Sequence, residues 1–309
     1  MKKSKEPVWM KKGPAQHFYQ HLLKNKSIVQ QWLTILRSAW GDPGHPDLEK
    51  YLDVSYKKQV IKSKDNLDIP ISLFIPKQLD SSAVFIYIHG GGWIAPTAGK
   101  HQAWAKKIAH LSKIKVISID YRLAPEHPYP AALEDCVTVY EYIRANSKAK
   151  VFIGGDSAGG NLAAAVALYC ADHAIAIPDK ILCLCPLMDF HFENYPSIFE
   201  LGIGNPRGDS SLLAFERFCY VPDKKDWKIP YVSPMYGQLQ NLPETLILIA
   251  EDDPLRDDNI AFVEKLKAAN VKVTILSYKD MPHTFYTYPQ FLPKQAQSAN
   301  EAISQFIIK

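Results

Sequence analysis

Short apolar runs alternate with helical segments along most of this chain, and this alternation limits the possible folds more than any other feature. The β-type runs lie at 84–88, 116–119, 151–153, 181–185, 245–249 and 271–276. Helical segments are expected between and after them, at about 100–112, 131–145, 158–173, 257–269 and 295–307. Continuous apolar strands separated by helices are typical of a parallel sheet that is covered on both faces. The alternation therefore predicts an α/β fold.

The segments outside the alternation extend this prediction. Residues 51–61 and 67–75 are β-rich and joined by a polar turn, which indicates an antiparallel pair at one edge of the sheet. With this pair the sheet has about eight strands and is mostly parallel. Residues 13–40 have helical periodicity, which favours a helix that packs on the body of the protein. Residues 188–228 are rich in aromatic side chains and turns, which indicates an insertion over the carboxyl edge of the strands, where ligands bind.

Composition excludes several classes of protein. The 309 residues carry a formal net charge of only +4, and the lysines are scattered, so we expect no nucleic-acid binding. No apolar run approaches the length of a membrane span, and no apolar segment follows the basic N-terminus, so we expect neither stable membrane insertion nor a signal peptide. Five cysteines, an odd number, argue against a disulfide framework and favour a reducing compartment, which predicts a cytoplasmic location.

Metal-binding patterns are weak. Cys183 and Cys185 lie inside an apolar run and are expected to be buried strand residues, and no Cys-x-x-Cys pair occurs. His17 and His21 would share a helix face, but the glutamate of His-Glu-x-x-His and a third ligand are missing. We therefore expect no metal and no cofactor.

The stretch Gly-Asp-Ser-Ala-Gly-Gly at residues 155–160 joins a β-type run to an alanine-rich helical segment. A serine between glycines at such a junction is how a tight turn exposes a nucleophile. Larger residues at 155 and 159 would clash in that turn, and the helix that follows favours negative charge at its N-terminus. Glycine and serine also occur together in ordinary turns, so Ser157 needs support from the rest of the chain.

A nucleophilic serine needs a base and a carboxylate that orients the base. Four acids follow the run at 245–249, namely Glu251, Asp252, Asp253 and Asp257, and their spacing does not choose among them. His283 follows the run at 271–276. The order serine, acid, histidine is the one found in α/β folds with this type of turn.

An oxyanion hole provides an independent indication. Acyl transfer needs backbone N–H donors directed at the developing oxyanion. The sequence His-Gly-Gly-Gly-Trp at residues 89–93 directly follows the run at 84–88, and its glycines allow the backbone to approach a substrate closely. The N–H of Ala158, directly after the serine, is the expected second source of donors.

With these elements the chain resembles the hormone-sensitive lipase family of α/β-hydrolases, in the subgroup whose tight turn around the serine reads Gly-Asp-Ser-Ala-Gly. The resemblance covers about residues 50–309. It rests on the segments 89–93, 121–135, 155–160 and 253–257 together with His283. The segment 121–135, Tyr-Arg-Leu-Ala-Pro-Glu-His-Pro-Tyr-Pro-Ala-Ala-Leu-Glu-Asp, is the most specific, because no general catalytic requirement explains it.

The resemblance implies a role for each site residue. The catalytic triad would be Ser157, Asp253 and His283. The oxyanion hole would be formed by Gly91, Gly92 and Ala158, with Gly90 as a further candidate. The chain departs from the family pattern at Thr284, where glycine is common, and at Asp258, where glutamate is common. Three neighbouring residues, His89, Glu126 and Asp156, are expected to support the loops around the site rather than to react.

The resemblance also implies the domains. Residues 1–45 would form an N-terminal helical cap segment. Residues 46–309 would form the α/β-hydrolase catalytic domain, with a cap insertion at about 188–228.

The implied activity is that of a serine carboxylesterase for short- to medium-chain acyl esters, with small-molecule substrates and an acyl-enzyme on Ser157. An amidase or lactonase with the same triad is an alternative, as is a membrane-acting lipase in which residues 14–40 form a lid. Plant gibberellin receptors share the fold and motifs but lack the catalytic histidine, and the presence of His283 argues against such a receptor. A homodimer is left open.

Overall fold

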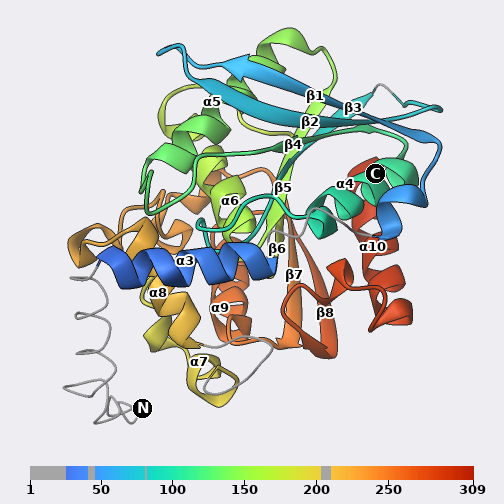
Figure 1. The fold of residues 1–309 in the computed structure, drawn as a ribbon. Coiled ribbons are helices and arrows are strands. Elements are labelled where there is room, and N and C mark those ends of the chain that lie inside the picture. Colours follow the sequence, from blue (N-terminus) through green and yellow to red (C-terminus); the bar gives the residue numbers. More distant parts are fainter. Residues whose placement is uncertain (1–25, 41–45, 81, 203–209) are drawn as a thin grey trace.

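The structure is a computed structural model that describes residues 26–40, 46–80, 82–202 and 210–309. Its centre is an eight-stranded sheet with the order β1-β2-β4-β3-β5-β6-β7-β8 (Figure 1). The strands are β1 (Val54–Lys62), β2 (Asp68–Pro76), β3 (Ala83–Ile88), β4 (Lys115–Ile119), β5 (Lys150–Asp156), β6 (Lys180–Leu184), β7 (Glu244–Asp252) and β8 (Val273–Pro282). β2 is antiparallel to both β1 and β4, and the other neighbours are parallel. The predicted mostly parallel sheet with an antiparallel pair at one edge is confirmed.

Helices cover both faces of the sheet, as the sequence predicts. The α-helices are α3 (Lys26–Trp40), α4 (Gly99–Ser112), α5 (Ala131–Asn146), α6 (Ala158–Asp172), α7 (Ser197–Glu200), α8 (Ser210–Tyr220), α9 (Arg256–Ala268) and α10 (Pro293–Ile308). The 3-10 helices are η1 (Pro46–Glu49), η2 (Phe192–Asn194), η3 (Lys224–Asp226), η4 (Pro234–Tyr236), η5 (Leu239–Asn241) and η6 (Phe285–Thr287). α4 and α10 pack on one face, and α5, α6 and α9 pack on the other.

The two faces follow from the period of a strand, in which successive side chains point to opposite sides. In β3, Ile86 and Ile88 belong to the core under α5 and α6, whereas Phe85 and Tyr87 belong to the core under α4 and α10. All four side chains are fully buried. A strand that is apolar at every position is therefore required here, and this is why its run in the sequence shows no polar alternation.

α3 lies across the molecule near the carboxyl ends of the strands (Figure 1). Leu33 is fully buried in the main core, which confirms a helix packed on the body of the protein over residues 26–40. Arg37 donates to the carbonyl oxygens of Ile94 and Ala124 and pairs with Glu126 at 2.7 Å. Residues 1–25 and 41–45, which include His17 and His21, lie outside the described residues.

The predicted aromatic-rich insertion is also packed against the core. Over the described residues of 188–228 the chain forms η2, α7, α8 and η3, and η4 and η5 follow before β7. Phe190 and Tyr220 are fully buried, and Tyr220 stacks on Trp93 with ring centroids 4.6 Å apart. Because Trp93 follows the glycines at 90–92, this stacking places α8 directly against that loop. Within the described ranges, no helix is both long enough and apolar enough to cross a membrane.

Candidate active site

Ser157 occupies a sharp turn between β5 and α6. Its φ is 53°, in the left-handed region, and its N–H donates to the carbonyl of Leu184 at 2.9 Å. A Cβ added to Gly155 or Gly159 would lie 2.1 or 2.0 Å from the carbonyl oxygen of Ile88. Because atoms cannot approach so closely, both positions require glycine. The tight turn that the sequence predicts is confirmed, and its left-handed serine stores about 1–3 kcal/mol of strain.

The turn presents the serine at the N-terminus of α6. Ala158 is the first residue of that helix, so its N–H has no carbonyl partner within the helix. The N–H groups of Gly160 and Asn161 donate back to the carbonyl of Ser157. Within the described residues the Ser157 hydroxyl forms no hydrogen bond. Catalytic hydrogen bonds in free enzymes are often long and tighten only in the substrate complex.

Asp253 and His283 are brought together from two adjacent strands. Asp253 directly follows β7 and His283 directly follows β8. The imidazole Nδ1 lies 2.6 Å from Asp253 Oδ2, and the other carboxylate oxygen accepts from the N–H of Leu255 at 2.9 Å. Asp253 is 2% exposed. Since Nδ1–H donates to the carboxylate, Nε2 is left as the atom that can accept a proton.

The electrostatic environment of His283 favours its charged form. Burial lowers the pKa of the imidazole, but the charge and hydrogen bond of Asp253 outweigh this effect, with smaller contributions from Asp156 and Glu216. The net result is a pKa above the usual histidine value. A base with this environment accepts a proton readily and is stabilised once it is protonated.

Two of the other acids at the carboxyl end of β7 have different partners. Glu251 accepts from the hydroxyl of Ser277, and Asp257 accepts from Arg256 and from the N–H of Ser197. The structure thus places Asp253, of the four acids, on the imidazole. The thiol of Cys185 lies within 4.8 Å of the imidazole and carboxylate atoms, and burial raises its pKa well above the usual value. The thiol is therefore protonated and contributes packing.

The glycine loop, residues 90–92 after β3, is hydrogen-bonded to Asp156, the residue before Ser157. The N–H of Gly90 donates to Asp156 Oδ1 at 3.0 Å, and the hydroxyl of Tyr87 donates to the same oxygen at 2.6 Å. Gly91 and Gly92 have φ values of 112° and 59°. Their N–H groups have no acceptor among the described residues. The predicted supporting role of Asp156 is confirmed, and the Gly90 N–H is already in use.

His89 supports the glycine loop through a contact to the Gly90 carbonyl and through its packing on Tyr121. Its Nδ1 lies 2.7 Å from the carbonyl of Gly90, and its ring stacks on Tyr121 at 4.3 Å. The hydroxyl of Tyr121 donates to the carbonyl of His89 at 3.0 Å. Burial, together with nearby His101, lowers the pKa of His89 to about 3, so the ring is neutral. This agrees with the predicted role of His89 as a hydrogen-bonded support.

The segment 121–135 forms the loop beside this support. The backbone N–H and Nε of Arg122 both donate to the buried carboxylate of Asp135, at 2.8 and 2.9 Å. Glu126 pairs with Arg37 from α3. These contacts link the segment to α5 and α3 and agree with the expected supporting role of Glu126.

Two features of the site were missed or underestimated from the sequence. The first is Glu216 of α8, whose side chain lies against Gly92. The run from Leu212 to Cys219 carries two adjacent charged residues, Glu216 and Arg217, so its pattern does not single out the acid. The second is Thr284, which adopts φ 51°, a conformation that a β-branched residue rarely takes. The glycine that is common at this position in the resembling family fits such a backbone.

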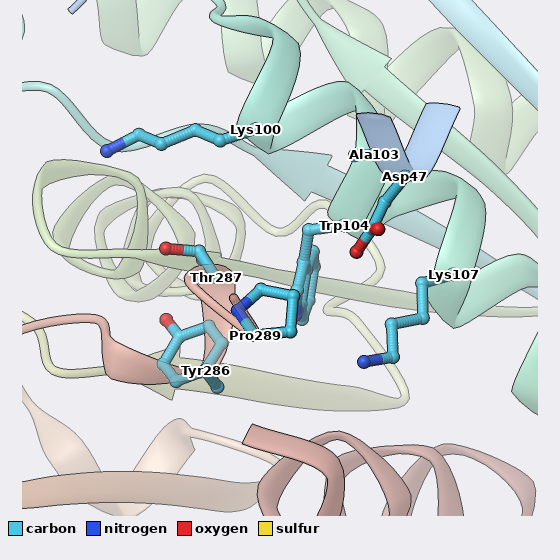
Figure 2. Close-up of a pocket in the computed structure, with 8 residues that line it drawn as sticks. All are labelled: Asp47, Lys100, Ala103, Trp104, Lys107, Tyr286, Thr287 and Pro289. Carbon is cyan, nitrogen blue, oxygen red and sulfur yellow. The ribbon is translucent and has the colours of Figure 1, made fainter. Parts of the chain in front are cut away.

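A small pocket lies away from these residues. It has a volume of about 10 Å³ and lies between Trp104 of α4 and the segment that contains Tyr286 and Pro289 (Figure 2). This is room for about one water molecule. The pocket contains none of the predicted site residues.

The comparisons with known proteins agree with this geometry. Residues 85–287 match the family model described as the alpha/beta hydrolase fold. An AB hydrolase superfamily protein of Schizosaccharomyces pombe is 32% identical over 223 residues, which are 68% of this chain and 65% of that protein. Carboxylesterase NlhH of Mycobacterium tuberculosis is 30% identical over 252 residues, 77% of each chain. A hyperthermophilic esterase from Pyrobaculum calidifontis superposes with a TM-score of 0.80 at 26% identity and covers 94% of this chain and 96% of its own.

The family model spans most of the chain, and the matched region contains the glycine loop, the serine turn and both residues of the acid–histidine pair. The fold around these segments is the one that the resemblance implies. The chain therefore belongs to the hormone-sensitive lipase-like family of α/β-hydrolases.

Proposed function

We propose that the protein is a serine carboxylesterase in which Ser157, His283 and Asp253 form the catalytic triad. The observation that carries this proposal is the 2.6 Å hydrogen bond between Asp253 and His283, at the edge of the sheet where Ser157 also lies. The carboxylic ester hydrolases among the relatives, such as the mycobacterial carboxylesterase, support the reaction class.

The mechanism follows from the atoms that are free to react. His283 Nε2 takes the proton of Ser157 as the serine oxygen attacks the ester carbonyl carbon. Asp253 holds the imidazole in the required tautomer and stabilises the imidazolium. The alcohol then leaves with the proton from His283, and water hydrolyses the acyl-enzyme by the same steps.

The oxyanion hole is formed by the N–H groups of Gly91, Gly92 and Ala158. The N–H groups of Gly91 and Gly92 have no acceptor within the described residues, and the N–H of Ala158 lies at the N-terminus of α6. All three are therefore available for the oxyanion. Gly90 is not included, because its N–H already donates to Asp156.

Two helical parts form the cap. α3, within the segment 1–45, and the insertion at about 188–228 close the space over the strand ends, whereas residues 46–309 supply the catalytic domain. The substrates are small-molecule esters with short to medium acyl chains. Five free and buried cysteines support a cytoplasmic location. The low net charge supports the absence of nucleic-acid binding, and a homodimer is left open.

The test is hydrolysis of p-nitrophenyl esters from acetate to palmitate by purified protein. Ser157→Ala is expected to lower kcat by about 10⁴-fold or more with unchanged folding, because it removes the nucleophile. Ser298→Ala, an exposed serine of α10, is the matched control and should retain full activity. Turnover that survives Ser157→Ala would refute the assignment. A maximum between acetate and hexanoate supports the esterase, a maximum at long chains the lipase, and faster cleavage of p-nitroanilides the amidase.

A further inference from the structure

Glu216 is a carboxylic acid inside the wall of the candidate site that the mechanism does not use. It belongs to α8 and is 7% exposed. A Cβ added to Gly92 would lie 2.1 Å from the carboxyl carbon of Glu216 and 2.3 Å from Oε1. The carboxyl group therefore touches the backbone of the loop whose N–H groups face the oxyanion.

The carboxyl group also lies near the base. The charge of His283 lowers the pKa of Glu216, and Glu216 in its ionised form raises the pKa of His283, so the two groups are close enough to interact. The group thus contacts the glycine loop and lies near the imidazole, the two parts of the site that are proposed to surround the reacting carbonyl.

Glu216 has no partner in the described part of the chain: neither a hydrogen bond nor an ion pair reaches its carboxyl oxygens. The neighbouring cation is already engaged, because Arg217 donates to the carbonyl of Phe190 at 2.6 Å, pairs with Glu193 and stacks on Trp227 at 3.8 Å. The carboxyl oxygens of Glu216 can therefore accept a hydrogen bond from a bound ligand without breaking a contact to another described residue.

The protonation state of Glu216 suits a ligand contact. Burial raises its pKa to about 8 against the opposing effect of His283, so the carboxyl is mostly neutral near pH 7. A neutral carboxyl beside the glycine loop does not repel the negative charge that develops on the substrate oxygen, whereas an ionised carboxyl does. Its carbonyl oxygen accepts a hydrogen bond in either state.

We propose that Glu216 determines substrate specificity by accepting a hydrogen bond from a donor group, a hydroxyl or an ammonium, that the ester carries near its scissile carbonyl. This inference rests on the proposed esterase function and specifies its substrate class. A purely apolar acyl chain would bury the carboxyl and leave it unpaired, which disfavours that ester relative to one with a donor. A site built to bind a polar group discriminates more strongly than an apolar pocket does.

The test compares pairs of esters with the same shape and with or without a donor. Ethyl 3-hydroxybutyrate and ethyl 3-methylbutyrate place the difference on the acyl side, and 2-hydroxyethyl butyrate and propyl butyrate place it on the alcohol side. Ethyl 3-aminobutyrate replaces the hydroxyl by an ammonium. Initial rates in a pH-stat at pH 7 give kcat/KM for the wild type and for Glu216→Leu, Glu216→Gln and the control Glu200→Leu. Glu200 is a carboxylate of α7 that pairs with Arg256.

The wild type is expected to prefer the donor ester of at least one pair by about ten-fold or more. Glu216→Leu should abolish the preference by accelerating the apolar ester relative to its partner. Glu216→Gln should retain the preference for a hydroxyl, and Glu200→Leu should behave as the wild type. A wild type that hydrolyses both members of every pair equally, or a preference unchanged in Glu216→Leu, overturns the inference but leaves the esterase function intact. A wild type that hydrolyses none of the esters overturns both.

Discussion

Asp156, the residue before Ser157, joins the serine turn to the glycine loop at residues 90–92. Its Oδ1 accepts from the hydroxyl of Tyr87 at 2.6 Å and from the N–H of Gly90 at 3.0 Å. Its Oδ2 lies 3.6 Å from Nε2 of His101, whose Nδ1 accepts from the N–H of Ala98. Nε2 therefore carries the proton and faces the carboxylate. Replacing Asp156 removes the link between the two halves of the site.

The structure sets the size of the effect. Asp156→Asn keeps both contacts of Oδ1, but each loses about 1 kcal/mol when its acceptor is no longer charged. The new amide also faces the N–H of His101, donor against donor. We expect a loss of about 2 kcal/mol in the free energy of unfolding. Asp156→Ala leaves the hydroxyl of Tyr87 and the N–H of Gly90 unpaired at about 1–3 kcal/mol each, so its expected loss is about 4 kcal/mol. At about 2 °C per kcal/mol in a domain of this size, Tm falls by roughly 8 °C.

The activity separates a positioning role from a purely structural one. Because a displaced oxyanion donor costs about 10²-fold or more, kcat for p-nitrophenyl butyrate should fall at temperatures where the variant is fully folded. The matched control is Asp179→Ala at the opposite end of β5, where Asp179 accepts from Arg144 and from the N–H of Val151. Thermal unfolding by circular dichroism gives Tm. The reasoning is refuted if Asp156→Ala loses stability but keeps the kcat of the wild type, as the control should.

Four further predictions concern the base, the cap and the turn. Because His283 must be neutral to act and its pKa is raised, kcat/KM should decline as pH falls with a midpoint above the ordinary histidine value of about 6.5. Asp253→Asn removes the charge that raises this pKa, so a pH–rate profile should show a lower midpoint and a kcat reduced by about 10⁴-fold. Arg37→Ala removes a part-exposed ion pair with Glu126 and two hydrogen bonds to the carbonyls of Ile94 and Ala124, about 2 kcal/mol together, so hydrogen exchange should accelerate in α3 and Tm should fall by about 4 °C. Gly159→Ala places a Cβ 2.0 Å from a carbonyl of β3, and calorimetry should show a loss of about 3 kcal/mol or more with little remaining activity.

The strands were predictable where burial alone determines them. The run at 84–88 matches β3 within one residue because every position of that strand is buried. The carboxyl ends of β7 and β8 were not predictable, since β7 continues through Glu251 and Asp252 and β8 continues to Pro282. Acidic residues have low strand propensity, and the lengthening of these two strands depends on their pairing with each other. Asp253 and His283 directly follow these extended ends, so the strand bounds expected from the sequence were wrong next to the site itself.

The same distinction applies to the catalytic residues. The serine turn was predictable because the need for glycine at 155 and 159 is local to the chain and follows from geometry. The choice of Asp253 among four acids was not, because it depends on a hydrogen bond to a residue 30 positions away. The family resemblance supplied that information, and the contact with His283 agrees with it. Neither the local sequence nor the family resemblance predicted Glu216, since only the packing of α8 on Gly92 brings it to the site.

These contacts divide the site into two parts of different origin. The serine turn and the glycine loop follow two strands of the central sheet, β5 and β3, and are joined by buried hydrogen bonds to Asp156. The wall that carries Glu216 comes from α8, outside the sheet. Catalysis requires reacting groups held on rigid elements, whereas specificity depends on what faces the rest of the substrate. Changes in α8 can therefore alter which ester is selected while the donors at Gly91 and Ala158 remain in place. This arrangement explains how the proposed acyl-transfer site and a carboxyl group inside its binding wall can coexist in one chain.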